Sequence, residues 1–320
     1  MRRVKVTDIS CEEVATCRYD WLVVGAGSES RSTHVATELA RKHVYVKRIL
    51  VLCFPDVKAK VRRSILSTVK QLSSEVEEVE LESDAHDKLY QILNERFLSE
   101  KVEAILVDYS GMSRVWYAAI LFWFYQVEKA LSSVRFIFLY AEGIYAKDFV
   151  NKNVVIKEVR AIPGCEGLIY RQAPTTLVLG FGFYGYASLC VCDQLEPDEL
   201  YTFSTIEEPL KRFPIDKQEG NQELETRALM HFKIPMSSVE MAYRCLSNVT
   251  VMQKINGNEL ILVPMGPKTH VLAAILVALS NRDVCVMRVR HDQYPNDVKP
   301  EGKIVACEIR FSDINNFQRT

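Results

Sequence analysis

The sequence predicts an α/β fold made of two tandem Rossmann-like halves, each with a mostly parallel sheet. Short apolar runs alternate with helical segments along most of the 320 residues, and a similar order of segments occurs twice. The runs are continuously apolar, which is typical of strands buried between helices on both faces of a parallel sheet. A chain of this length suits about two domains. We place the first half at residues 1–150 and the second at residues 151–320.

In the first half, apolar runs predict strands with helices between them. The expected strands are Asp20–Gly25, Arg48–Phe54, Val76–Leu81, Val102–Asp108 and Val134–Tyr140. The expected helices are Thr33–Lys42, Val57–Leu72, His86–Leu98 and Met112–Ala130. In the second of these helices, Val61, Ile65, Val69 and Leu72 recur three or four positions apart, which is the spacing of one helix face.

Short β-like pieces fill Asn151–Ile169, after which the pattern of the first half returns. The expected strands are Thr175–Leu179, Glu199–Phe203, Glu259–Val263, Val284–Val289 and Ile304–Phe311. The expected helices are Tyr184–Gln194, Glu223–Phe232, Ser237–Cys245 and Lys268–Ser280. A polar loop that contains a proline and a glycine is expected at Lys211–Asn221.

Four glycines predict an internal duplication with pseudo-twofold symmetry. Gly25 and Gly111 each follow an apolar strand and precede a helix, 86 positions apart. Gly180 and Gly266 repeat both the context and the spacing of 86 positions. The alternative is a pair of unrelated α/β domains whose spacing agrees by chance.

Charge and composition exclude several classes of protein. The 40 basic and 41 acidic residues leave a net charge of −1, so no overall field attracts extended nucleic acid or anionic lipid. The longest apolar stretch, Val115–Val127, is shorter than the roughly 20 residues that cross a bilayer. The start, MRRVKVTDIS, lacks the apolar core of a secretory signal. We therefore expect a cytoplasmic protein without a membrane segment. We also expect no metal site, because the nine cysteines include no CxxC pair.

Four loops are expected at the carboxyl ends of the first and fourth strands of the two halves: Gly25–Ser32, Tyr109–Arg114, Gly180–Gly185 and Pro264–His270. In open parallel sheets, ligands bind beyond such strand ends, where the strand order switches. Each loop leads into a helix, whose free N–H groups and positive dipole end favour an anion. The cations Arg31, Arg114 and Lys268 suit phosphate, as do the hydroxyl groups beside them.

The candidate ligand-binding residues come from these loops and from the strand before the second one. They are Gly25, Ser28, Arg31, Ser32, Asp108, Ser110, Ser113, Arg114, Gly180, Gly182, Phe183, Tyr184, Gly266, Lys268, Thr269 and His270. The structural alternative is helix capping for the hydroxyl residues and a tight turn for the glycines. Phe181, Phe183 and Tyr184 suit stacking on a nucleobase, and the alternative for them is packing in the core.

Recognisable catalytic motifs are few. The sequence contains no GxSxG, HExxH or P-loop pattern, and His270 and Asp108 are the candidate catalytic residues. Gly180-Phe-Gly-Phe-Tyr-Gly185 matches the GxGxxG fingerprint of dinucleotide-binding folds. The second strand of that half ends in Phe203-Ser204-Thr205, without the acidic residue that holds an NAD ribose. We therefore predict no cofactor, with NAD(P) as the alternative.

The segment ILVPMGPKTHVLAAILVAL resembles the strand-four motif of CRISPR-associated Rossmann-fold (CARF) domains, which often contains a Gly-Gly-Thr-Lys turn. It is also similar to the Gly-Pro turn of SAVED domains, in which two such units are fused into a pseudo-dimer. The resemblance implies a sensor of nucleotide second messengers in prokaryotic antiviral defence, with a ligand that touches all four loops. Pro267 and Lys268 replace the Gly-Thr of the CARF turn. Because the sequence contains no recognisable effector, the resemblance implies a partner protein that carries the output.

The leading hypothesis is a soluble binding module for a nucleotide-like or phosphorylated ligand, acting as a sensor or regulatory subunit. The first alternative is an enzyme that uses the same cleft, either a nucleotide or nucleoside hydrolase or transferase, or an NAD(P)-dependent oxidoreductase. The second alternative is an interaction subunit with vestigial sites. An exposed apolar patch over Val115–Phe124 would favour that subunit, although burial explains the run as simply.

Overall fold

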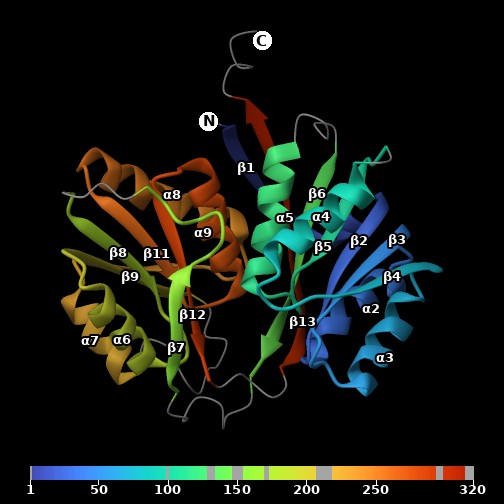
Figure 1. Cartoon of the computed structure of the whole chain (residues 1–320), viewed down its shortest axis with the longest axis horizontal. Helices are drawn as coiled ribbons and strands as arrows, with labels where there is room; N and C mark the ends of the chain where they lie inside the picture. The colour runs from blue at the N-terminus through green and yellow to red at the C-terminus, as the bar shows by residue number, and fades with distance from the viewer. Residues whose placement is uncertain are drawn as a thin grey trace. The chain divides into compact units, whose positions relative to one another are not determined.

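The computed structural model describes residues 2–98, 101–127, 134–145, 154–168, 173–206, 218–292 and 298–313. The chain divides into two compact units: unit 1 comprises Met1–Ile144 and Asn296–Thr320, and unit 2 comprises Tyr145–Pro295. Each unit has its own mostly parallel sheet with helices on both faces (Figure 1). The predicted α/β class with two Rossmann-like sheets is therefore confirmed.

Among the described residues, the sheet of unit 1 has the strand order β1-β13-β6-β5-β2-β3-β4. Its strands are β1 (Arg2–Ile9), β2 (Arg18–Ala26), β3 (Tyr45–Cys53), β4 (Glu75–Glu80), β5 (Ala104–Asp108), β6 (Arg135–Ile144) and β13 (Lys299–Asp313). Strands β2 to β6 run parallel, whereas β13 is antiparallel to β1 and to β6. The helices are α1 (Cys11–Ala15), the 3-10 turn η1 (Ser30–Thr33), α2 (His34–Arg41), α3 (Ala59–Val69), α4 (His86–Phe97) and α5 (Arg114–Val127).

The sheet of unit 2 has the order β10-β9-β8-β11-β12-β7 within the described part of the chain. Its strands are β7 (Ile156–Ala161), β8 (Thr175–Gly180), β9 (Glu199–Thr205), β10 (Met230–Ile234), β11 (Glu259–Pro264) and β12 (Val284–His291). Only β7 runs antiparallel to its neighbour among these strands. In Figure 1, α6 (Gly185–Leu195) and α7 (Glu219–Arg227) cover one face, and α8 (Val239–Ile255) and α9 (Lys268–Ser280) cover the other.

The five parallel strands of each unit follow the same order. When they are numbered along the chain, each sheet reads 3-2-1-4-5, so the first strand lies between the second and the fourth. These are the first five strands of the Rossmann order 3-2-1-4-5-6, whose switch point lies between strands one and four. The switch points are therefore β2/β5 in unit 1 and β8/β11 in unit 2. Unrelated Rossmann-like domains share this order, so the internal duplication stays a prediction.

The last strand belongs to a different sheet from the one expected. Strand β13 pairs with β6 and β1, and it completes the sheet of unit 1 instead of extending the second half. Strand β1 lies outside the predicted elements, yet its buried Val4 and Val6 alternate with polar residues, as in a strand with one covered face. The predicted boundary at residue 150 falls in 146–153, which lies outside the described residues.

One predicted helix is partly wrong. Helix α7 ends at Arg227, and Met230–Ile234 forms the edge strand β10, although the sequence predicts a helix as far as Phe232. Leu224, Ala228 and Phe232 are spaced four apart as on a helix face, and a short apolar run does not distinguish helix from strand. Helix α8 continues to Ile255, well beyond its predicted end.

The strongly apolar helix α5 is buried instead of forming a surface. Val115 is 0% exposed and Phe124 is 2% exposed. The exposed patch that would favour an interaction subunit is therefore not found over this helix. Within the described residues, no helix combines the length and the apolarity that crossing a membrane requires.

A paired carboxylate links two antiparallel strands of unit 1. Glu308 of β13 accepts hydrogen bonds from Arg135 of β6 (Nη2 to Oε2, 3.2 Å) and from Arg310 (Nη2 to Oε1, 2.7 Å). Burial by itself raises the pKa of the Glu308 carboxyl, but the two guanidinium groups outweigh burial and hold that pKa below its ordinary value.

We expect Glu308→Gln to make unit 1 less sensitive to acid. A carboxyl whose pKa is lower in the folded state stabilises the fold above the unfolded value of about 4.5, and the stabilisation is lost as the pH falls through the folded pKa. Urea denaturation at neutral pH and at about pH 3 measures the free energy of unfolding under both conditions. The decrease between the two should be smaller in the variant than in the wild type, by up to about 1 kcal/mol. Glu301→Gln, an exposed change on the same strand, should follow the wild type. Identical pH curves for all three proteins would contradict this role of Glu308.

Candidate functional site

The predicted loops meet in pairs, one pair at the switch point of each unit. In unit 2, the loops that follow β8 and β11 approach each other backbone to backbone. A Cβ atom at Gly182 would lie 2.8 Å from the carbonyl oxygen of Met265, and one at Gly266 would lie 2.8 Å from that of Phe181. Only glycine fits such an approach, because it carries no Cβ atom.

The loops that follow β2 and β5 make the corresponding contact in unit 1. A Cβ atom at Gly111 would overlap the carbonyl oxygen of Gly25, and one at Gly25 would lie 2.7 Å from the backbone nitrogen of Met112. Backbone atoms therefore occupy the space directly between these two loops.

Arg31, the predicted phosphate ligand of unit 1, is buried and engaged within the protein. Its side chain forms an ion pair with Glu29 and donates from Nη1 to the hydroxyl of Tyr140 at 2.8 Å. The guanidinium carbon also lies 5.3 Å from the centre of the Tyr140 ring. Arg31 is 2% exposed, and its backbone nitrogen donates to the carbonyl oxygen of Val298. These contacts connect η1 to β6 and to the segment that leads into β13.

Other candidate residues of unit 1 also have internal partners. The Ser32 hydroxyl donates to the carbonyl oxygen of Gly27 at 3.3 Å, and the Ser110 hydroxyl accepts from the backbone nitrogen of Ala141 at 2.8 Å. Asp108 is 1% exposed, and its Oδ1 accepts from the backbone nitrogen of Ser110 at 3.0 Å. The polar groups at this switch point thus stabilise the turn itself.

Ser113 caps a helix, as the structural alternative for the hydroxyl residues expects. Its Oγ accepts from the backbone nitrogen of Trp116 at 3.1 Å in the first turn of α5. Ser28 is exposed, and Arg114 is partly exposed at the first position of α5. Ser28 and Arg114 are therefore the predicted polar residues of unit 1 that remain accessible.

In unit 2, the candidates Lys268, Thr269 and His270 form the first turn of α9. Thr269 is 0% exposed, and its hydroxyl has no hydrogen-bond partner within the described part of the chain. His270 packs on Phe203, with ring centres 5.6 Å apart, and its Nε2 lies 3.3 Å from the carbonyl oxygen of Pro235. Lys268 is partly exposed. The turn thus combines a cation with a buried hydroxyl that no described residue satisfies.

The two helices that begin at this switch point lack side-chain caps. The N-cap residue is Tyr184 for α6 and Pro267 for α9, and neither side chain hydrogen-bonds to the first turn. The first N–H groups of a helix have no partner within the helix, and the peptide dipoles give that end a partial positive charge. Both termini therefore attract a negative group at the carboxyl edge of the sheet.

Two aromatic residues of the glycine-rich loop belong to the core. Phe181 is 1% exposed and stacks on His231, with ring centres 5.3 Å apart. Tyr184 is 8% exposed and meets His291 edge-on at 5.3 Å. Burial, with a smaller effect of Asp292, raises the pKa of Tyr184 to about 12, so its phenol is neutral at physiological pH.

The third aromatic residue of the loop, Phe183, is partly exposed. It packs against Tyr145, whose ring centre is 4.6 Å away and whose plane is tilted by 55°. Tyr145 is also partly exposed, and sequence reasoning misses it, because it precedes the loop by almost forty positions and belongs to no motif.

Two further residues support the glycine-rich loop without any signal in the sequence. Asn221 of α7 is 0% exposed and donates from Nδ2 to the carbonyl oxygen of Gly182 at 3.2 Å, across 39 positions of sequence. His231 of β10 lies between the hydroxyls of Thr202 (2.9 Å) and Ser204 (3.1 Å) on β9. These hydrogen bonds hold the His231 ring in place, and the ring in turn packs on Phe181 at the start of the loop.

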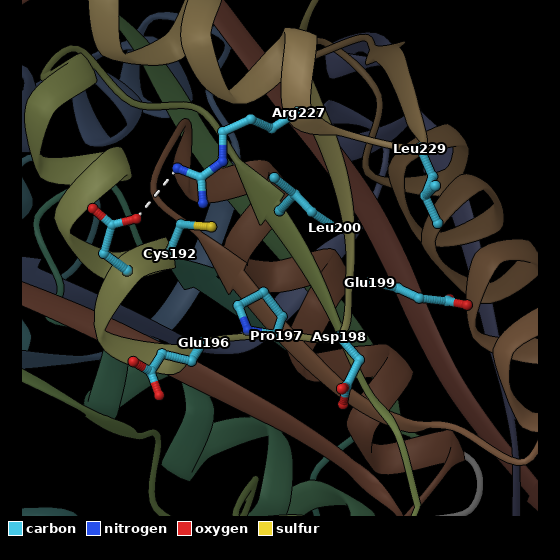
Figure 2. Close-up of a pocket in the computed structure, with 9 residues that line it drawn as sticks. Cys192, Glu196, Pro197, Asp198, Glu199, Leu200, Arg227 and Leu229 are labelled. Atoms are coloured by element: carbon cyan, nitrogen blue, oxygen red, sulfur yellow. Dashed lines mark hydrogen bonds and ion pairs between the residues drawn. The ribbon is translucent and has the colours of Figure 1, made fainter.

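A hollow of about 460 Å³ lies at the amino end of β9, the opposite edge of the sheet from the predicted loops. Its lining, drawn in Figure 2, consists of Cys192, Asp193, Glu196, Pro197, Asp198, Glu199, Leu200, Arg227 and Leu229. Four carboxylates face one guanidinium there, which disfavours phosphate. Within the described residues, no group of three His, Cys, Asp or Glu side chains is arranged to hold a metal ion. We therefore locate the candidate site at the switch point of unit 2, where the helix N-termini and Lys268 favour an anion, and not in this acidic hollow.

No protein-family model matches the chain, and no curated protein matches it. Among solved structures, it is similar to Escherichia coli MccB in complex with MccA, at 11% identity and a TM-score of 0.26; the match covers 50% of this chain and 46% of MccB, less than half of that chain. It is similar to the cytoplasmic domain of a prokaryotic cation chloride cotransporter at 7% identity and a TM-score of 0.27, covering 85% and 95% of the two chains. It is also similar to an NADH-dependent reductase complexed with NAD, at 8% identity and a TM-score of 0.26. That match covers 69% of this chain and 97% of the reductase chain. Similarities this low carry no argument about function.

We expect Arg31→Met to destabilise unit 1. Loss of the guanidinium removes the cation beside Glu29 and the donor to Tyr140, which costs up to about 3 kcal/mol of unfolding free energy. Urea denaturation measures this loss. Arg114→Met, at the partly exposed cation of the same switch point, should change the unfolding free energy by no more than about 0.5 kcal/mol. Equal stability of Arg31→Met and the wild type would contradict the structural role of Arg31.

Proposed function

We propose that unit 2 binds a phosphorylated, nucleotide-like ligand at the switch point between β8 and β11. The observation that carries this proposal is Thr269, a fully buried hydroxyl without a hydrogen-bond partner among the described residues, in the first turn of α9. Leaving such a group unsatisfied costs about 1–3 kcal/mol. A ligand oxygen that accepts the Thr269 proton would remove this cost.

The charges around Thr269 favour an anionic ligand. Lys268 adds a positive charge in the same turn, and the uncapped N-termini of α6 and α9 add partial positive charge. Phosphate has the charge and the number of acceptor oxygens that this arrangement can use.

The proposal locates binding in unit 2 because unit 1 uses its polar groups internally. Arg31 pairs with Glu29 and Tyr140, Ser113 caps α5, and Ser110 holds the backbone of β6. The matching elements of unit 2, the first turn of α9 and the start of α6, have no such side-chain caps.

The proposal extends to a biological role as a sensor or regulatory subunit in prokaryotic antiviral defence. In this role the protein would act in the cytoplasm, and a partner protein would carry the output. The support is the resemblance of the Gly266–His270 turn to CARF and SAVED domains, together with two sheets of Rossmann order in one chain.

The enzyme alternative lacks a comparable observation. His270 is 1% exposed and packed on Phe203, and Asp108 is bonded to the turn of Ser110 in unit 1. Both side chains thus have partners within the fold, whereas the Thr269 hydroxyl has none among the described residues.

We expect Thr269→Val to weaken ligand binding about 10- to 150-fold, because hydrogen bonds to charged groups contribute about 1.5–3 kcal/mol. A thermal-shift panel of ADP, inorganic pyrophosphate, NAD(P) and cyclic oligoadenylates first identifies a ligand that raises the melting temperature by mass action. Isothermal titration calorimetry with that ligand then compares the wild type and Thr269→Val.

Thr269→Ser, which keeps the hydroxyl, is the matched control and should retain wild-type affinity within about threefold. Without ligand, Thr269→Val should be at least as stable as the wild type, because it removes a buried hydroxyl that has no partner among the residues the structure describes. The proposal fails if no compound of the panel shifts the melting temperature, or if Thr269→Val binds as tightly as the wild type.

A further inference from the structure

We propose that the outer edge of strand β1 binds an extended acidic segment of a partner protein, which adds to the sheet of unit 1 as a further strand. Three features carry this proposal: the place of β1 at the edge of the sheet, a basic residue on its exposed face, and the shortage of carboxylates around that face. The proposal goes beyond the proposed function, because it locates a docking surface and does not depend on the ligand site of unit 2.

Strand β1 has one partner strand. Within the described residues it pairs with β13 only, along the whole of Arg2–Ile9. In an antiparallel pair, the N–H and C=O groups of alternate residues point away from the partner strand, so about half of those of β1 face outward. An edge of this kind can accept another extended segment through main-chain hydrogen bonds.

The side chains of β1 alternate between a covered and an exposed face. Val4 and Val6 are buried, whereas Lys5, which lies between them, is exposed. In the strand register Lys5 lies opposite Arg310 of β13, so the two cations share the exposed face of the sheet. A strand added beside β1 would therefore place every second side chain next to this basic face.

Few carboxylates neutralise this face. Glu308 of β13 is shared by Arg310 and by Arg135 of β6, which donate to it at 2.7 and 3.2 Å. Glu13 of α1 is also close enough to Arg135 to interact with its charge, but its carboxylate accepts from the backbone at the start of α1 at 2.7 Å. Lys5 has no ion-pair partner within the described part of the chain. Like charges opposite each other on neighbouring strands are destabilising, and an anionic partner would remove that cost.

The charges favour an acidic polypeptide over a second copy of this chain or a nucleic acid. Pairing of β1 with the β1 of a second copy would bring like charges together. The other edge of the sheet, β4, is rich in glutamate, but Glu77 pairs with Arg96, and Glu78 and Glu80 pair with Arg62. A nucleic acid has no regular row of N–H donors for the outward C=O groups of β1, whereas a polypeptide strand has one.

The test uses a fluorescein-labelled octapeptide of alternating glutamate and threonine. A peptide with lysine in place of glutamate is the charge control, and oligothymidine is the nucleic-acid control. Fluorescence polarisation would measure each probe with the whole protein as wild type, Lys5→Glu, Arg310→Gln and Lys303→Glu. The last variant makes the same charge change as Lys5→Glu at an exposed lysine of β13, outside the residues that pair with β1.

We expect the acidic peptide to bind the wild type and Lys5→Glu to weaken this binding at least about fivefold, because the reversal replaces an attraction across the strands by a repulsion. Arg310→Gln should weaken binding about twofold or more, and Lys303→Glu should bind like the wild type. Hydrogen exchange of the amides of Arg2–Ile9 should slow when the peptide is bound, since strand addition covers the outward N–H groups. Melting temperatures check that the variants remain folded, and Lys5→Met, which removes only the charge, decides if Lys5→Glu does not fold.

Several results overturn the proposal. One is the absence of saturable binding of the acidic peptide up to about 1 mM. Equal binding of the lysine peptide, or unchanged affinity in Lys5→Glu, would show that the charge of β1 does not select the partner. Peptide binding without slower exchange in β1 would reject strand addition.

Two further measurements exclude the other occupants of the edge. Binding of oligothymidine without binding of the acidic peptide would assign the surface to nucleic acid and overturn the proposal. Sedimentation velocity of the protein alone would show association with rising concentration if a second copy pairs there, and loss of that association in Lys5→Glu would also overturn it. None of these results depends on a ligand of unit 2, so the proposed function is tested separately.

Discussion

Each switch point depends on a close backbone contact between two turns. One turn follows the first parallel strand of the unit, and the other follows the fourth. The strand order 3-2-1-4-5 makes these strands neighbours, so the turns that follow them must share one small space. A Cβ atom at Gly111 or Gly266 would collide with the opposite backbone. Because side chains are excluded from the contact itself, the groups left for the proposed ligand are backbone N–H groups and the first residues of the helices that follow.

Two units with one strand order use this constraint differently. In unit 1, a glutamate two positions before Arg31 neutralises it, and the hydroxyl of Tyr140 accepts a further hydrogen bond from it, so the cation connects parts of the fold. In unit 2, α9 begins after a proline, which has no side-chain oxygen to cap the helix, and Thr269 remains unsatisfied among the described residues. A few side chains thus distinguish the two edges chemically, while the order of the strands stays the same.

Continuous apolar strands and the spacing of the glycines are sufficient to predict the α/β class and the loops that meet, because both depend on local sequence and on strand order. Local patterns fail where the partner is distant. The charge of Arg31 is readable, yet its engagement with Tyr140 spans 109 positions. Strand β10 has helical spacing in its sequence and becomes a strand by pairing with β9. Tyr145 and Asn221 belong to no motif, and only the packed structure brings them to the glycine-rich loop. The site predictions for Ser28, Arg114 and Lys268 stay predictions.

The position of β13 has a consequence for how the chain is made on the ribosome. Strand β1 pairs with β13 alone in the described sheet, and β6 needs β13 on its outer side. These strands lie at opposite ends of the sequence, so all of unit 2 is synthesised before unit 1 can complete its sheet. Until then β6 presents an unpaired edge, which is the kind of surface that recruits strands from other chains. Vectorial synthesis therefore favours a sequence in which the inserted unit folds first and the enclosing unit closes last.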